Sequence, residues 1–194
     1  RSLPLSIPFK GRMEVQGEAV MRLSVLEDYN RSAAEPLKNA RNAAAGALRN
    51  LDPAESAKRN LDAFFYNIGY IQGAKFNNSR EMFDFLRENK FKVSPIIGYY
   101  TDPLEAFAAA MDLDEKRKEE DFLTDGMVIK VCDYKTRDFL GNTDRFPRWA
   151  IAYKFEAEQV STTVLDIRWE VGRTGKLTPL AHVEPVELSG ATVR

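Results

Sequence analysis

The sequence holds 194 residues, of which 44% are hydrophobic, which is enough for one domain with a real core and a smaller second unit. The net charge of −1 excludes a global basic field, so any contact with nucleic acid would have to be local. Cys132 is the only cysteine and His182 the only histidine, which excludes an internal disulfide and argues against a zinc cluster or a His-centred triad. No apolar run reaches the length of a membrane span and no signal peptide is visible, so we expect no membrane partner.

The two ends of the sequence indicate a segment of a longer protein. The chain begins with Arg1 rather than methionine and enters at once a stretch punctuated by prolines. It ends at residues 191–194, inside what we predict to be a strand.

The first predicted element is a strand over residues 13–21, where apolar and polar side chains alternate. Ser24 then has the position of a helix N-cap, with Glu27 at the capping-box position. The side chains of the strand that we expect to face a core are Met13, Val15, Ala19 and Met21.

An alanine-rich helix is expected over residues 39–49. Its small side chains cannot build a core alone, so we interpret it as a thin helix that approaches another element closely. Arg41 and Arg49 lie on roughly one side, where they could reach a partner that bears phosphates. The pattern leaves open a surface helix whose arginines pair with local carboxylates. Residues 52–55 carry the cap, N1 proline and N3 glutamate of a further helix.

Residues 63–71 are aromatic and β-branched, and we interpret them as a central strand whose aromatic side chains lie in the core. A base-stacking surface is the alternative. An amphipathic helix over residues 78–88 and an extended segment over residues 93–100 are expected to follow. The inward side chains of that helix are predicted to be Met82, Phe83, Phe85 and Leu86.

Asp102 has the signature of another helix start. The charged run over residues 114–121 is expected to be a solvated helix face. The inward side chains of this helix are predicted to be Leu104, Phe107, Ala108 and Met111.

Two short runs, residues 125–130 and 150–155, are interpreted as buried strands that each carry a single lysine. The period of two places Lys130 beside Val128, and Lys154 beside Ala150 and Ala152. Small residues around a lysine leave an open surface where a ligand could lie, and an ammonium is costly to desolvate without an anionic partner. The joint occurrence favours a phosphate or nucleotide site. Edge strands with solvated or ion-paired lysines remain the alternative.

Between these runs, residues 134–140 predict a short helix that Gly141 stops, and residues 145–148 an extended, basic lead-in. Beyond residue 158 the pattern is purely that of strands. Residues 163–171 and 177–183 alternate around a hairpin turn at residues 172–175, and His182 is expected on the outer face. This pattern is typical of a small barrel such as an OB-fold, of which about half would be present.

Five runs of residues, in this order, resemble the bacterial NAD⁺-dependent DNA ligases. The run Asp-Gly-x-Val-Ile-Lys alone is only moderately specific, because ATP-dependent ligases and mRNA-capping enzymes share it. The alanine-rich stretch and the Val-Gly-Arg-Thr-Gly turn are typical of the NAD⁺ family, and the resemblance covers essentially the whole chain. The five runs are Glu14–Glu18, Asn39–Arg49, Asp125–Lys130, Pro147–Lys154 and Val171–Gly175.

The resemblance implies an α+β fold. Residues 1–158 would form a nucleotidyltransferase (ATP-grasp-like ligase) adenylation domain with antiparallel sheets, lacking its N-terminal part. Residues 159–194 would be the N-terminal strands of an all-β OB-fold. In that family a lysine attacks the α-phosphorus of NAD⁺ and releases nicotinamide mononucleotide. The AMP then moves to the 5′-phosphate of a DNA nick, and the 3′-hydroxyl displaces it.

By position, the resemblance also implies the site residues. Glu18 would hold the AMP ribose and help place a hydrated magnesium ion. Lys130 and Lys154 would contact the adenylate phosphate, and Asp125 would support them, so these four are the expected catalytic residues. No metal ligand is predicted within the chain. The expected contacts to the DNA backbone are Arg41, Arg49, Arg148, Arg173 and Thr174.

The expected cofactors are NAD⁺ as the AMP donor and Mg²⁺, with Zn²⁺ expected only in a C-terminal region outside this chain. The expected partner is nicked double-stranded DNA, met during DNA replication and repair. We expect a monomer in the bacterial cytoplasm, associated with the nucleoid when it is on DNA.

The sequence departs from the family pattern at the nucleophile. The family's lysine lies in Lys-x-Asp-Gly, whereas residues 124–126 read Thr-Asp-Gly, so this stretch alone could not form the lysyl-AMP. Smaller departures are Gln16, Ala40 and Glu156, where arginine, proline and proline are usual. Two alternatives stay open: an ATP- or GTP-using nucleotidyltransferase, and a non-catalytic DNA-binding module on the same fold.

Overall fold

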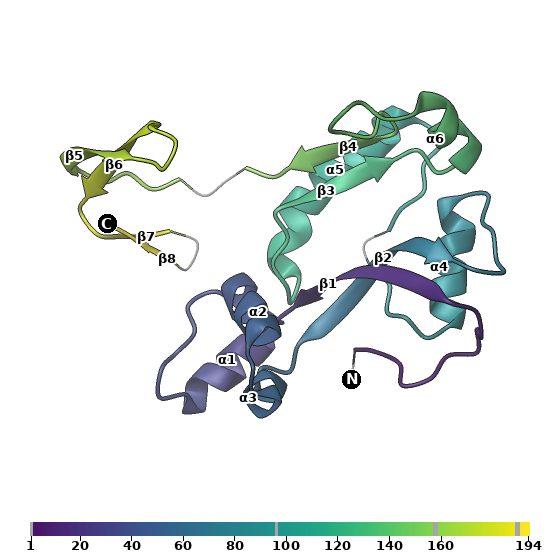
Figure 1. Cartoon of the computed structure of the whole chain (residues 1–194), viewed down its shortest axis with the longest axis horizontal. Helices are drawn as coiled ribbons and strands as arrows, with labels where there is room; N and C mark the ends of the chain where they lie inside the picture. The colour runs from purple at the N-terminus through teal and green to yellow at the C-terminus, as the bar shows by residue number, and fades with distance from the viewer. Residues whose placement is uncertain (1, 96, 157–158, 189–190) are drawn as a thin grey trace. The chain divides into compact units, whose positions relative to one another are not determined.

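The computed structural model describes residues 2–95, 97–156, 159–188 and 191–194 (Figure 1). The chain divides into two compact units, the first formed by Arg1–Pro36 and Ala40–Phe155 and the second by Leu37–Asn39 and Glu156–Arg194. Glu158, where we predicted a domain boundary, lies outside the described residues. Every ladder between named strands is antiparallel, as the expected α+β class requires. Within the described residues, no helix is long and apolar enough to cross a membrane.

In the first unit, β1 (Met13–Val20) pairs with β2 (Asp62–Ile71). The predicted alternation of β1 is confirmed, because Met13, Val15 and Ala19 are half-buried while the glutamates are exposed. The prediction of a central strand is wrong for β2. Its other edge makes a single parallel bridge, from Phe65 to Val93, and the extended segment predicted after Val93 forms no further strand in its described part. Ile96, within that segment, lies outside the described residues.

One face of the β1–β2 ladder carries the core of this unit. Helix α4 (Ser79–Glu88) covers it, with Met82 and Leu86 packed against Phe65. The predicted inward face of α4 is confirmed, although Phe83 and Phe85 are only half-buried. Its first turn is closed by the Asn78 side chain, which accepts a hydrogen bond from the N–H of Glu81 at 3.0 Å.

The opposite face of the ladder is largely polar, although Phe64 on it is buried. Glu18 lies opposite Phe64, and Gln16 opposite Asn67, whose amide donates to Gln16 at 2.8 Å. The register shifts between Gln16 and Gly17, so β2 has one extra residue there, Tyr66, and Tyr66 and Asn67 point to the same side. Tyr66 follows the core residue Phe65 and so lies on this face. Tyr66 and Tyr70 are 46% and 51% exposed, and the prediction that all aromatics of this strand lie in the core is wrong for both.

Three helices lie between β1 and β2: α1 (Leu23–Ser32), α2 (Ala40–Arg49) and α3 (Pro53–Lys58). The thin-helix interpretation of α2 is confirmed, because α2 contacts β1 and its alanine side is buried. The prediction for Ser24 is wrong. Arg22 is the N-cap of α1, and Ser24 instead donates through its N–H and hydroxyl to Asp121 at 2.8 and 2.7 Å. The predicted cap of α3 is confirmed, since Asp52 accepts from the N–H of Ala54 at 2.8 Å.

Helix α5 (Pro103–Lys116) continues into the short helix η1 (Arg117–Glu119). Its predicted inward face is wrong, because Leu104, Phe107 and Met111 are exposed whereas Ala110 is fully buried. The helix has two apolar stripes. It contacts β3 with the stripe of smaller side chains buried, because small side chains let the helix lie closer to the strand.

The charged run over residues 114–121, which begins in the last turn of α5, is not wholly a solvated face. Arg117 pairs with Asp114 at 2.8 Å and lies 4.8 Å from the ring centre of the buried Phe155, while Asp121 holds α1. Part of this charged run therefore packs against distant residues, although its sequence alone is typical of a solvated surface.

Strands β3 (Gly126–Lys130) and β4 (Ala150–Lys154) pair with each other. The interpretation as buried strands is wrong, since their side chains are half-buried or exposed, with Val128 at 54% and Ile151 at 66%. Helix α6 (Tyr134–Leu140) between them ends at Gly141, which has φ 65°, as predicted. The lead-in at residues 145–148 bends, with a bridge between Asn142 and Pro147, instead of running straight.

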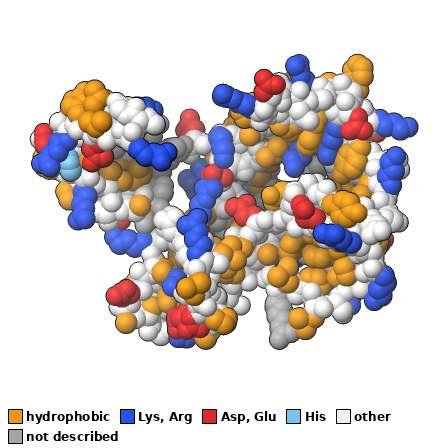
Figure 2. Space-filling view, in the orientation of Figure 1, with side chains coloured by type: hydrophobic (Ala, Val, Ile, Leu, Met, Phe, Trp, Pro, Cys, Tyr) orange, Lys and Arg blue, Asp and Glu red, His pale blue; other side chains and the backbone are white. Residues whose placement is uncertain are grey.

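The second unit contains β5 (Val164–Val171), β6 (Leu177–Val183), β7 (Val186–Leu188) and β8 (Ala191–Val193). The predicted hairpin is confirmed, with Gly175 at φ 77° in its turn. His182 lies opposite Asp166 and is half-buried, so it is less exposed than we expected. Apolar side chains such as Trp169, 65% exposed, stay at the surface of this unit, and Figure 2 shows such side chains on the face that it presents.

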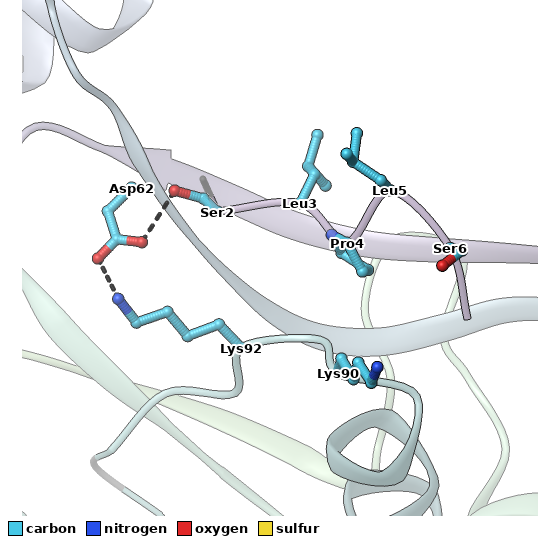
Figure 3. Close-up of a pocket in the computed structure, with 8 residues that line it drawn as sticks. All are labelled: Ser2, Leu3, Pro4, Leu5, Ser6, Asp62, Lys90 and Lys92. Carbon is cyan, nitrogen blue, oxygen red and sulfur yellow. Dashed lines mark hydrogen bonds and ion pairs between the residues drawn. The ribbon is translucent and has the colours of Figure 1, made fainter. Parts of the chain in front are cut away.

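A buried carboxylate, Asp62, ties the first unit together at the start of β2. It accepts hydrogen bonds from Arg22 at 2.8 and 3.0 Å, from the Ser2 hydroxyl at 3.1 Å and from Lys92, beside an open pocket (Figure 3). Burial alone would raise the pKa of Asp62, but the hydrogen bonds, first from Lys92 and then from Arg22, lower it from 3.8 to about 2.

We expect Asp62→Asn to lower the free energy of unfolding by about 2 kcal/mol at pH 7, because the amide cannot pair with the two cations. Since the folded pKa is depressed, this stabilisation is complete above the unfolded value of 3.8 and is lost as the pH falls through about 2. Urea unfolding followed by Trp149 fluorescence in a Trp169→Phe background measures it. Asp84→Asn, which breaks an exposed pair with Arg87, is the control. A difference from the parent that stayed constant between pH 4 and 2 would contradict the assignment.

Candidate functional site

The two lysines singled out in the sequence share one face of the β3–β4 ladder. Gly126 lies opposite Lys154, Val128 opposite Ala152, and Lys130 opposite Ala150, so all six residues point to the same side. Four residues of strand separate the two lysine positions, which is about 13 Å. Apart from the lysines, this face carries only the small side chains of Val128, Ala150 and Ala152, and Gly126 adds none. The open surface between two ammonium groups that we predicted from the sequence is therefore present.

Lys130 leans over an aromatic ring of the neighbouring ladder. Its Nζ lies 5.7 Å from the centre of the Tyr66 ring, on the polar face of β1–β2. Although the Lys130 side chain as a whole is exposed, partial burial of its ammonium, and then the positive charge of Arg137, lower the pKa of Lys130. We did not select Tyr66 from the sequence; the base-stacking alternative for residues 63–71 was the signal that could have found it. The site thus combines cations from β3 and β4 with an exposed aromatic ring from β2.

Asp125 precedes β3 and binds two cations at once. Its Oδ2 accepts a hydrogen bond from Lys154 Nζ at 3.2 Å and another from Arg41 Nη1 at 3.2 Å. The bond from Lys154, followed by that from Arg41, lowers the pKa of Asp125 against the effect of burial. Arg41 therefore does pair with a carboxylate, but with one 84 residues away in the sequence rather than with a local one. Asp125 touches Lys154 directly, so its predicted supporting position is physically available.

Glu18 lies on the polar face of β1–β2, the face that carries Tyr66, and its side chain is exposed. Gly17 before it is required for close packing, because a Cβ there would run into the carbonyl oxygen of Phe64 and the ring of Phe65. Among the described residues, no ion pair joins Glu18 to Lys130 or Lys154. The structure therefore places Glu18 on the face that adjoins the lysines without direct contact to them.

The predicted DNA contacts are exposed at several places. Arg49 lies in the last turn of α2, and Arg148 precedes β4, with its N–H bonded to the carbonyl of Gly141 at 3.1 Å. Arg173 and Thr174 form the exposed tip of the β5–β6 hairpin in the second unit. The side chains of these four residues are accessible to a large ligand. Their contact with DNA stays a prediction.

The carboxylates of the site do not make a metal centre on their own. In the described part of the chain, no group of three or more His, Cys, Asp and Glu side chains could hold a metal ion. What the arrangement can do is bind a ligand that carries both a phosphate, for the ammonium groups, and a flat ring, for Tyr66.

Two sequence models match the chain. The model described as the NAD-dependent DNA ligase adenylation domain matches residues 1–158, and the model described as the NAD-dependent DNA ligase OB-fold domain matches residues 161–194.

Similar curated proteins carry the name DNA ligase. That of Alkaliphilus metalliredigens is 53% identical over 193 residues, and that of Finegoldia magna 54% identical over 193 residues. That of Clostridium botulinum (strain Loch Maree) is 49% identical over 194 residues. Each comparison covers 100% of this chain but only 29% of the relative, so the chain spans 29% of the length of the proteins it matches.

We expect Gly126→Ala to disturb the site, because the added Cβ would run into the carbonyl oxygen of Tyr153 and lie 3.2 Å from the Cα of Lys154. The strands must then separate where Asp125 meets Lys154, at a cost of about 1–3 kcal/mol in unfolding free energy. Gly46→Ala, in an exposed position of α2 with nothing within 4 Å, should instead stabilise by about 0.5–1 kcal/mol. Amide exchange of β3 and β4 measures the first effect; unchanged protection in Gly126→Ala would count against the close contact.

Proposed function

Because the chain belongs to the NAD-dependent DNA ligase family, we propose that the intact protein is an NAD⁺-dependent DNA ligase. It would seal nicks with 5′-phosphate and 3′-hydroxyl ends in duplex DNA, in replication and repair. The observation that carries the proposal for this chain is the shared face of Lys130 and Lys154, with only small side chains between them. The first unit is proposed to be the nucleotidyltransferase part of the adenylation domain.

The residues present fit the adenylate part of NAD⁺. Lys130 and Lys154 would hold its phosphate, and the exposed ring of Tyr66 is suited to stack on a base. Glu18 would hold the ribose from the polar face of β1–β2. The bound NAD⁺ supplies the AMP group, and the lysines offset the charge that builds up on phosphorus as the group is transferred.

The nucleophile of the proposed reaction is not among these 194 residues, because no Lys-x-Asp-Gly run occurs in them. In the intact protein, its amine would attack the α-phosphorus, and nicotinamide mononucleotide would leave as that P–O bond breaks. Lys130 and Lys154 would assist by position and charge. A Mg²⁺ ion would be held largely by phosphate oxygens and water, with Glu18 as the nearby carboxylate. A Zn²⁺ site is proposed only for a region outside the chain.

Nicked DNA is the proposed partner of the exposed arginines. Arg41 and Arg49 on α2 would meet the phosphates of the nicked strand, and Arg148, Arg173 and Thr174 would contact the DNA backbone. We propose that the protein acts as a monomer in the bacterial cytoplasm, on DNA within the nucleoid. An ATP- or GTP-using enzyme is disfavoured, because the matching models are those of the NAD-dependent family.

We expect Lys154→Ala and Lys130→Ala in the intact protein to slow AMP uptake at least about a hundredfold, the loss typical of removing one transition-state contact. The measurement is transfer of radiolabel from adenylate-labelled NAD⁺ to the protein in the presence of Mg²⁺. Arg87→Ala, an exposed arginine of α4, is the control and should react like the wild type. A wild-type protein that takes up no AMP would identify a non-catalytic DNA-binding module, and uptake from ATP instead would identify the other nucleotidyltransferase class.

We expect Arg49→Ala in the intact protein to weaken binding to nicked duplex DNA and to reduce the slope of log K against log salt by about one unit, as for one lost phosphate contact. Fluorescence anisotropy with nicked DNA at several salt concentrations measures both quantities. An unchanged salt slope would contradict a phosphate contact, even if the affinity fell.

A further inference from the structure

Asp125 joins two residues to which the proposed function gives separate tasks. Lys154 belongs to the proposed adenylate site, whereas Arg41 is proposed to meet DNA. Both donate to the same atom, Asp125 Oδ2, at 3.2 Å. One carboxylate oxygen therefore links the nucleotide site to the helix that is expected to meet the nick.

The backbone beneath each of these side chains is held in place. The carbonyl of Asp125 accepts from the N–H of Phe155 at 3.1 Å, which ties the start of β3 to the residue that follows β4. Lys154 is held opposite Gly126 by the ladder. Arg41 extends from α2, whose alanine side is buried and which contacts β1. Because three packed elements carry the three side chains, their meeting is a consequence of the fold.

The charges of the three groups explain what Arg41 can do. Two cations and one carboxylate give a net charge of +1 (2 − 1 = +1), which attracts a phosphate. Without Arg41, Asp125 and Lys154 would form a neutral pair (1 − 1 = 0), and the carboxylate would hold Lys154 alone. Lys154 would then have to break an ion pair with a carboxylate that has no other cationic partner among the three groups before it could reach a phosphate.

We propose that Arg41 is a positioning residue of the adenylate site: it shares the charge of Asp125, and thereby keeps Lys154 available for the nucleotide phosphate before any DNA is bound. The inference rests on the proposed function and deepens it, since it gives the alanine-rich helix a part in the AMP-transfer step. A role limited to DNA would leave that step unaffected.

The test uses the intact protein without DNA, freed of bound AMP by excess nicotinamide mononucleotide. AMP binding is measured by calorimetry, and single-turnover AMP uptake from radiolabelled NAD⁺ is timed. We expect Arg41→Ala to weaken AMP binding and to slow uptake, each by about fivefold, the effect of one exposed charge-assisted hydrogen bond. Arg41→Lys should recover most of both losses. Arg87→Ala, which removes an arginine from a comparable exposed pair at 2.8 Å, should change neither.

Three outcomes would overturn the inference. In the first, Arg41→Ala binds and takes up AMP like the wild type and loses only affinity for nicked DNA. In the second, Arg41→Lys is as impaired as Arg41→Ala, which would make shape rather than charge responsible. In the third, Arg41→Ala lowers the melting temperature more than Arg87→Ala does, which would attribute the loss to folding. A wild type that takes up no AMP would refute the proposed function instead, while the AMP titration would still decide the role of Arg41.

Discussion

The antiparallel register between β3 and β4 is the constraint on which the candidate site depends. Side chains alternate along a strand, so Lys130 and Lys154 share a face only because Gly126 lies opposite Lys154. A slip of one residue in either strand would send that strand's lysine to the other side. This register requires glycine at position 126, since a Cβ there would run into the carbonyl oxygen of Tyr153.

Close approach by small residues is how the surrounding elements bring their polar groups to this face. The buried alanines of α2 let the helix lie near β1 and Asp125, and the buried Ala110 lets α5 pack on β3. Tyr66 follows the core residue Phe65, so the alternation of β2 places its ring on the other face, beside Lys130. Bulky side chains at these positions would hold the elements apart, and the ammonium groups, the ring and the carboxylate would no longer lie within reach of one ligand.

Local signals in the sequence were read correctly where the chemistry is itself local. The caps at Asp52 and Asp102, the stop at Gly141 and the turn around Gly175 all depend on residues within a few positions of each other. The cap assigned to Ser24 failed because a distant carboxylate, Asp121, competes for its hydroxyl and N–H. The inward face of α5 failed for a related reason: two apolar stripes were present, and contact with β3 favoured the smaller one.

Residue type and period alone were enough to place the two lysines among small neighbours and to mark the arginines of the alanine-rich helix, while the resemblance of five runs of residues indicated the family. They could not show that Arg41 and Lys154 share Asp125, a contact that spans 84 residues between Arg41 and its partner. Nor could they bring Tyr66 and Lys130 together, because that contact depends on how β3 packs beside β2. Several carboxylates and rings compete for each cation in the sequence, and only the packing of distant elements selects one partner. The short-range pattern of the sequence therefore determines which charged and aromatic residues are available to the site, while long-range packing determines which of them pair with each other.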